Sequence, residues 1–148
     1  MAWTKPITDR TQSDVEYARA HRDSPSILKG ARNYTDLQRW TGNIHHLKDM
    51  FNSLGFNIAV TCKTSWTLGE VPPRAEINKI RDDLTTLRSV YAVLPTTPPT
   101  PALPYINYQK MNDIEKILLD IEQIIQGFSA AVIHSGTTQS GNTGGYRV

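Results

Sequence analysis

The sequence predicts a mainly α-helical protein with three long amphipathic helices and one short N-terminal helix. Of its long connectors, one is proline-rich and one contains a short β-strand. Both terminal arms are extended. Three stretches predict the long helices, because each places large apolar residues at successive gaps of three, four, three, four and three. This spacing forms an apolar stripe, here called the seam, along a helix that packs lengthwise against other helices.

Each seam has five principal positions, completed by a sixth apolar residue. The principal positions are Leu37, Trp40, Ile44, Leu47, Phe51; Ile77, Ile80, Leu84, Leu87, Tyr91; and Met111, Ile114, Leu118, Ile121, Ile125. The sixth residues are Leu54, Leu94 and Phe128. An amide residue follows the first position in every stretch, as Gln38, Asn78 or Asn112. These amides either bond to a partner helix and fix its register, or simply suit helix starts and face solvent.

Capping residues and glycine predict where the first helices begin and end. Residues 1–12 form an extended arm, and Ser13-Asp14-Val15-Glu16 fits a capping box that opens a short helix over about 14–21. A polar loop follows. Thr35-Asp36-Leu37-Gln38 fits a second capping box, which opens the first long helix, and Gly55 closes it.

Beyond this helix, the pattern changes between strand, helix and proline-rich chain. Residues 57–66 alternate apolar and polar side chains, which predicts a short strand. Pro73 suits the first position of the second helix, which must end by Leu94 because prolines crowd the next ten residues. Asn107 is the predicted cap of the third helix, which ends near Gly127, and residues 130–133 predict a second short strand.

The domain prediction is a helical structural domain over 1–134, including the N-terminal arm, and a Gly/Ser/Thr-rich C-terminal arm over 135–148. The connector over 95–106 reaches about 37 Å as polyproline chain, whereas a helix of about eighteen residues is about 27 Å long. Such a connector can return along a whole helix and allow successive helices to pack in parallel. Alternatively, it is an ordinary surface loop.

Composition excludes several classes of protein. The chain has 148 residues, and its 16 basic and 14 acidic residues give a net charge of +2, too weak a bias to indicate nucleic-acid binding. No apolar run approaches the roughly 20 residues that span a membrane, and the N-terminus lacks the apolar core of a signal peptide. We therefore expect synthesis in a cytoplasm. The lone Cys62 excludes an internal disulfide and a cysteine-built zinc site.

No residue pattern predicts catalysis, a cofactor or a metal site. His45 and His46 are adjacent, so on a regular helix they point about 100° apart and cannot share a metal ion. The acidic residues of the third helix, Asp113, Glu115, Asp120 and Glu122, are predicted to form a solvated face. Nucleophile elbows and phosphate-binding loops are absent from the sequence. We expect a protein that is not an enzyme.

Three aromatic residues are candidates for a partner interface. Trp3, Trp66 and Tyr146 lie in segments predicted to be extended, where aromatic side chains often contact other subunits. The alternative is that each packs against the core of its own chain.

Four sequence stretches resemble small tail or baseplate proteins of bacteriophages and prophages of Gram-positive bacteria. They are Ile7-Thr8-Asp9-Arg10-Thr11-Gln12-Ser13-Asp14-Val15, the helix start over 33–44, Trp66-Thr67-Leu68-Gly69-Glu70-Val71-Pro72 before 77–81, and Ile106-Asn107-Tyr108 before 112–116. Gln38, Trp40 and Thr41 depart from the Asn, Ile and Glu of the family pattern and leave the seam intact.

This resemblance implies a structural subunit of the virion tail, made in the host bacterial cytoplasm and present in several copies. Its partners would be itself and other tail or baseplate proteins, and it could connect the tail to a fibre or receptor-binding protein. No membrane or nucleic-acid partner is expected. The alternative is a helical adaptor or tail-assembly factor, outside the virion, that binds a partner helix in an incompletely closed seam. Weak nucleic-acid binding is a third hypothesis, which a steep dependence of affinity on salt would support.

Overall fold

The computed structural model describes residues 2–24, 27–103 and 105–142, with the backbone alone described over 129–142. It contains four α-helices within these ranges: α1 (Gln12–Ala20), α2 (Tyr34–Ser53), α3 (Arg74–Arg88) and α4 (Tyr108–Asn142). No β-strand occurs among the described residues. The predicted mainly α class is confirmed.

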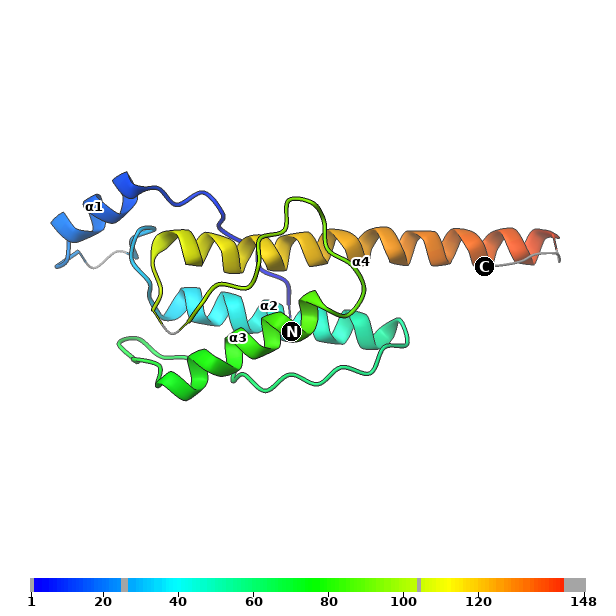
Figure 1. Cartoon of the computed structure of the whole chain (residues 1–148), viewed down its shortest axis with the longest axis horizontal. Coiled ribbons are helices and arrows are strands. Elements are labelled where there is room, and N and C mark those ends of the chain that lie inside the picture. The colour runs from blue at the N-terminus through cyan, green and yellow to red at the C-terminus, as the bar shows by residue number, and fades with distance from the viewer. Residues whose placement is uncertain (1, 25–26, 104, 143–148) are drawn as a thin grey trace.

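The three longer helices α2, α3 and α4 form a bundle in which each contacts the other two. All three run in the same direction, because each connector returns along the bundle before the next helix begins (Figure 1). The structure therefore has the crossover arrangement that the length of the proline connector allows. The short helix α1 lies at the end of the bundle where α2 and α4 begin (Figure 1).

The core consists of the seam residues together with Cys62, Trp66 and Ile117. Every principal seam residue except Tyr91 is at most 3% exposed. Tyr91 is 58% exposed and lies beyond the end of α3. The helix thus ends before Leu94, as predicted, but the predicted seam position Tyr91 lies outside it. The helix ends because Ser89 serves as its C-cap and donates its hydroxyl proton to the carbonyl of Thr86 at 2.8 Å.

The helix starts differ from the predicted ones by two residues in the first two cases. Thr11 and Asp14 form the capping box of α1, and Asn33 and Asp36 form that of α2. Pro73 is the N-cap of α3 and stands just before its first residue. The predicted cap of α4 is confirmed, because Asn107 Oδ1 accepts a hydrogen bond from the Lys110 amide at 2.8 Å.

Both predicted strands are wrong. Residues 57–66 are extended, and their even-numbered side chains are buried or half-buried while the odd-numbered ones are exposed. The alternation was therefore a correct sign of an extended chain with one covered face, but that face packs on helices. Residues 130–133 belong to α4, as do residues 135–142, which were predicted as an extended arm. The rest of that arm lies outside the described residues.

Three extended segments fill the three grooves of the bundle. We call residues 2–11 the N-terminal arm, residues 57–66 the middle segment and residues 95–106 the proline connector. Hydrogen bonds attach the N-terminal arm to α2 and α4, the middle segment to α2 and α3, and the described part of the proline connector to α3 and α4. The molecule thus repeats a unit made of one extended segment and one long helix.

Gly55 ends α2 in a backbone conformation that favours glycine. Its φ is 101°, and the amides of Gly55 and Phe56 donate to the carbonyls of Asn52 and Phe51, which is the Schellman arrangement. The rings of Phe51 and Phe56 also contact each other, with centroids 5.4 Å apart.

Alanine substitutions at two open glycines should therefore have opposite effects on stability. A Cβ at Gly55 or at Gly127 meets nothing within 4 Å. The backbone conformation alone therefore determines whether alanine raises or lowers stability at each position. Gly55→Ala should lower the free energy of unfolding by about 1 kcal/mol because of its positive φ. Gly127→Ala, inside α4, should raise it by about 0.5–1 kcal/mol. Urea denaturation measures both, and effects of the same sign would contradict this account of the two backbones.

Candidate functional site

The N-terminal arm docks in the groove between α2 and α4 through contacts to its backbone. Asn43 accepts from the Thr4 amide at 2.9 Å and donates to the Thr4 carbonyl at 2.7 Å. Asn112 does the same with Arg10, at 3.1 and 2.9 Å. Two side-chain amides thus replace the hydrogen bonds that a neighbouring strand would make. The arm runs antiparallel to both helices. On α2, Thr4 bonds to Asn43 and Arg10 to Asp36, nearer the helix start. On α4, Ile7 bonds to Glu115 and Arg10 to Asn112, again nearer the start.

A buried group of four charged side chains fixes the end of this arm. The Arg10 guanidinium lies 2.6 Å from Glu115 and 3.1 Å from Asp36, and its side chain is fully buried. Arg39 approaches both carboxylates to 2.5 Å. Two cations and two anions make the group neutral, as a buried charge network must be if it is to form at low cost. We call these four residues the charge network.

The remaining donors of Arg10 are also satisfied. Arg10 donates to the carbonyl of Ile7 at 2.9 Å and to that of Lys29 at 3.2 Å. Glu115 additionally accepts from the Ile7 amide at 3.0 Å. Burial lowers the pKa of Arg39, but its hydrogen bonds and Coulombic attraction to Glu115, and then to Asp36, raise that pKa overall. Arg39 therefore stays positively charged.

The middle segment is held in a similar way between α2 and α3. Asn52 accepts from the Ile58 amide at 2.8 Å and donates to the Ile58 carbonyl at 3.1 Å. The buried Asp83 accepts from the amides of Thr61 and Cys62 at 3.1 and 2.8 Å. His45 contacts the Cys62 carbonyl at 2.7 Å. Side chains of the helices again take the place of a strand partner.

Asp83→Ala should lower the free energy of unfolding by about 1–3 kcal/mol, because two backbone amides lose their acceptor in a partly buried place. The neighbouring Asp82 is the matched control, since its carboxylate is exposed and bonds only to Arg81 among the interactions observed. Asp82→Ala should change stability by less than about 0.5 kcal/mol. Chemical denaturation of both variants measures the difference, and equal effects would refute the proposed role of Asp83.

The predicted interface aromatics have different places in the structure. Trp66 is 2% exposed, and its indole N–H donates to Thr41 at 3.2 Å, so it belongs to the chain's own core. Trp3 is half-buried and its ring lies 5.6 Å from that of His46. Both therefore follow the alternative of packing on their own chain. Tyr146 lies outside the described residues.

The repeated amide residues bond to extended segments of this chain. Gln38 donates to the Trp66 carbonyl at 2.9 Å, and Asn112 holds the N-terminal arm as described above. Each thus marks a groove that an extended segment occupies. The third amide, Asn78, is half-buried at the equivalent position of α3.

Two acidic residues that were predicted to face solvent are fully buried instead. Glu115 belongs to the charge network, and Asp120 accepts from the hydroxyls of Thr96 and Thr97 in the proline connector at 3.1 and 2.8 Å. The prediction failed because extended segments cover the sides of α4 that point away from the seam. The sequence interpretation also missed Arg10 and Arg39, whose only signal was that each lies in a stretch that carries the resemblance.

The residues considered for chemistry occupy structural positions. Cys62 is buried, and burial, reinforced by Asp83, raises the pKa of its thiol well above the ordinary value. No three histidine, cysteine or carboxylate side chains in the described part of the chain are grouped closely enough to hold a metal ion. Within the described ranges, no helix combines the length and the apolarity that spanning a lipid bilayer requires.

Comparison with known protein families, characterised proteins and solved structures finds no match to this chain.

Proposed function

We propose that this chain is a structural subunit of a phage tail tip, a baseplate or a tail-derived particle. It assembles with copies of itself and with other tail proteins through helix packing and exchange of arms, and it connects the tail to a fibre or receptor-binding protein. The resemblance of four sequence stretches to such proteins suggests the location. The observation that carries the assembly role is the projection of α4 beyond the bundle.

Helix α4 continues well past residues 111–125, over which its described side chains enter the core. Phe128 packs against Tyr91 and Phe56, with ring centroids 5.1 and 6.1 Å apart. From residue 129 to Asn142 the helix runs on with no other described element beside it (Figure 1). This projection is about 21 Å long at 1.5 Å per residue. Isolated helices of such length are marginal in water, so we infer that a neighbouring subunit packs against the projection.

The N-terminal arm supports the exchange of arms between copies. Its groove recognises the backbone of Thr4 and Arg10 through Asn43 and Asn112, and the charge network adds one specific side chain. The arm of a second copy would satisfy the same contacts. Between α1 and α2 lies a connector over residues 21–33, which can extend about 40 Å and so can carry the arm to a neighbour.

Quantitative mass spectrometry of gradient-purified particles tests the proposal. We expect the chain to co-sediment at a fixed ratio to a known tail component after prophage induction. A chain truncated after residue 128 should keep its helical fold, because it retains every described core residue of α2, α3 and α4, but should fail to enter particles. A chain that is abundant in the lysate and absent from intact particles would contradict the virion role.

That last result would favour an adaptor or assembly factor outside the virion. The seam residues offer little support for an adaptor that binds a helix in an open seam, because α2, α3 and α4 already bury them against one another. Such an adaptor would have to use the projection of α4, and truncation after residue 128 would then abolish binding to its cellular partner.

A further inference from the structure

We propose that the cavity between α1, the loop before α2 and the start of α4 binds a small organic anion that carries a phosphate ester or a carboxylate. This inference does not depend on the proposed structural function. It rests on the volume of the cavity, on two arginine side chains and on the absence of acidic residues from its described lining.

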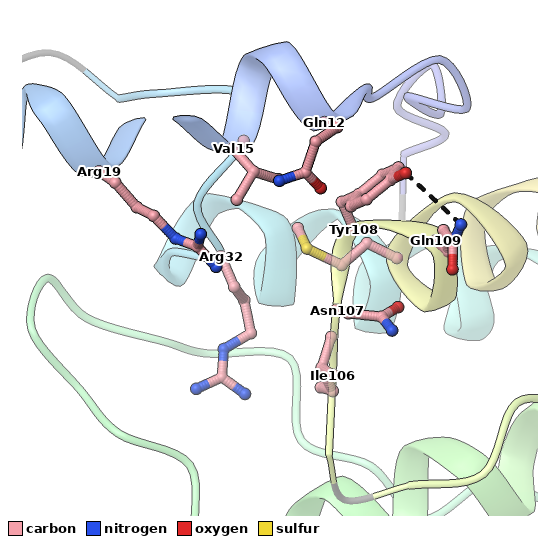
Figure 2. A pocket seen from close by; sticks show the side chains of 10 residues that line it. Gln12, Val15, Arg19, Arg32, Ile106, Asn107, Tyr108 and Gln109 are labelled. Atoms are coloured by element: carbon pink, nitrogen blue, oxygen red, sulfur yellow. Dashed lines mark hydrogen bonds between the residues drawn. The ribbon is translucent and has the colours of Figure 1, made fainter. Parts of the chain in front are cut away.

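The cavity has a volume of about 480 Å³. Three separate parts of the chain line it, as Figure 2 shows: Gln12, Val15 and Arg19 of α1, Gly30 and Arg32 of the following loop, and residues 106–109 with Met111 at the start of α4. Sites for small molecules commonly have volumes of about 300–1,000 Å³. The volume therefore has ample room for a small organic anion such as a phosphorylated triol or a sugar acid.

The charge of the lining selects an anion. Among the described residues that line it, Arg19 and Arg32 are the only charged ones. Neither forms an ion pair or hydrogen bond with any described residue, whereas the buried Arg10 and the half-buried Arg39 are fully engaged in the charge network. Two guanidinium groups at one cavity, with no carboxylate to neutralise them, favour a ligand that supplies the negative charge.

The start of α4 does not supply this charge recognition by itself. Asn107 Oδ1 accepts from the Lys110 amide, and the Asn107 carbonyl accepts from the Met111 amide at 3.0 Å. Two amides at this helix start, those of Lys110 and Met111, are therefore already bonded within the protein. Recognition of the anionic group is assigned to the two arginines.

The rest of the lining suits an organic body bearing hydroxyl groups. Gln12, Asn107 and Gln109 present side-chain amides, and the Tyr108 hydroxyl accepts from Gln109 at 3.4 Å, which leaves its own proton to donate. Val15, Ile106 and Met111 supply apolar surface. The lining thus combines six polar side chains with three apolar ones.

Nuclear magnetic resonance titration of the full chain tests the proposal. The probes are glycerol 3-phosphate and glucuronate, and the matched uncharged controls are glycerol and glucose. We expect at least one anion to shift the backbone amide signals of Gln12, Gly30, Arg32 and Gln109 at concentrations of about 1–10 mM. The uncharged compounds should leave these signals in place, and the identity of the binding anion distinguishes a phosphate from a carboxylate ligand.

Substitution of the two arginines separates a site from general attraction of anions. Arg19→Ala with Arg32→Ala should weaken binding at least about tenfold, as expected for loss of two charge-assisted contacts. Arg22→Ala is the matched control, because Arg22 is exposed near α1 but lines a neighbouring cavity. It should change affinity less than about twofold. The proposal fails if neither anion shifts these signals at 10 mM, if the uncharged compounds bind equally well, or if Arg22→Ala weakens binding as much as the double variant.

Discussion

Arg10→Met should lower the free energy of unfolding by about 3–5 kcal/mol, the usual cost of removing one partner from a buried ion pair. The guanidinium contacts two buried carboxylates, and its side chain is fully buried. Without it, Asp36 and Glu115 share only Arg39, and a net negative charge stays inside the protein. Methionine retains much of the length and packing of arginine, so the loss measures mainly the charge and its hydrogen bonds. Urea denaturation followed by far-ultraviolet circular dichroism gives the value.

Two further variants isolate the role of the charge network. Arg10→Lys keeps the charge but cannot reproduce the several N–H groups that reach Asp36, Glu115, Ile7 and Lys29, so its stability should lie between those of Arg10→Met and the unaltered chain. Arg74→Met replaces an exposed arginine at the start of α3 and should cost less than about 0.5 kcal/mol. If Arg10→Met were tolerated as well as Arg74→Met, the charge network would contribute nothing measurable to stability.

The helices were predictable because their cause is local and periodic. Ile80, Leu84 and Leu87 recur at the spacing of one helix face, and burial on that face follows from the hydrophobic effect alone. The ends of the helices were less predictable, since several neighbouring residues can serve as caps. Thr11 and Asn33 took the cap positions in place of Ser13 and Thr35.

The charge network could not be predicted, because its members are far apart in sequence and lie off the seam. Arg10 and Glu115 are separated by 105 residues. On a helix, a carboxylate away from the apolar face ordinarily meets water. Here an extended segment covers it, and nothing in the periodic pattern of α4 encodes that cover. The polar faces of these helices are second packing surfaces, specified by hydrogen bonds instead of apolar area.

The repeated amide after the first seam position was the visible sign of this second surface. Gln38 and Asn112 occupy equivalent places on α2 and α4, and each bonds the backbone of an extended segment in a different groove. Repetition in the sequence therefore reflects repetition of a helix together with its segment. The same logic supports exchange between copies, because a groove that binds a backbone accepts an identical arm from a neighbour.

Leu118→Asp should abolish cooperative folding, which makes it the most damaging substitution that we expect. Leu118 is 0% exposed at the third seam position of α4. The change removes a buried aliphatic side chain, at a cost of about 2–5 kcal/mol when alanine replaces it. It also places an unpaired carboxylate in the core, which costs several kcal/mol more. Together these losses approach the whole stability of a typical domain, about 5–15 kcal/mol.

The matched control is Gln123→Asp, which adds the same charge to an exposed position of the same helix and should change stability by less than about 0.5 kcal/mol. Leu118→Ala should remain folded with a lower denaturation midpoint and so separates lost packing from buried charge. If Leu118→Asp unfolded cooperatively and near the midpoint of Leu118→Ala, the carboxylate would have to reach water or a cation. The seam of α4 would then be open to solvent, and helix packing could not be the basis of the fold.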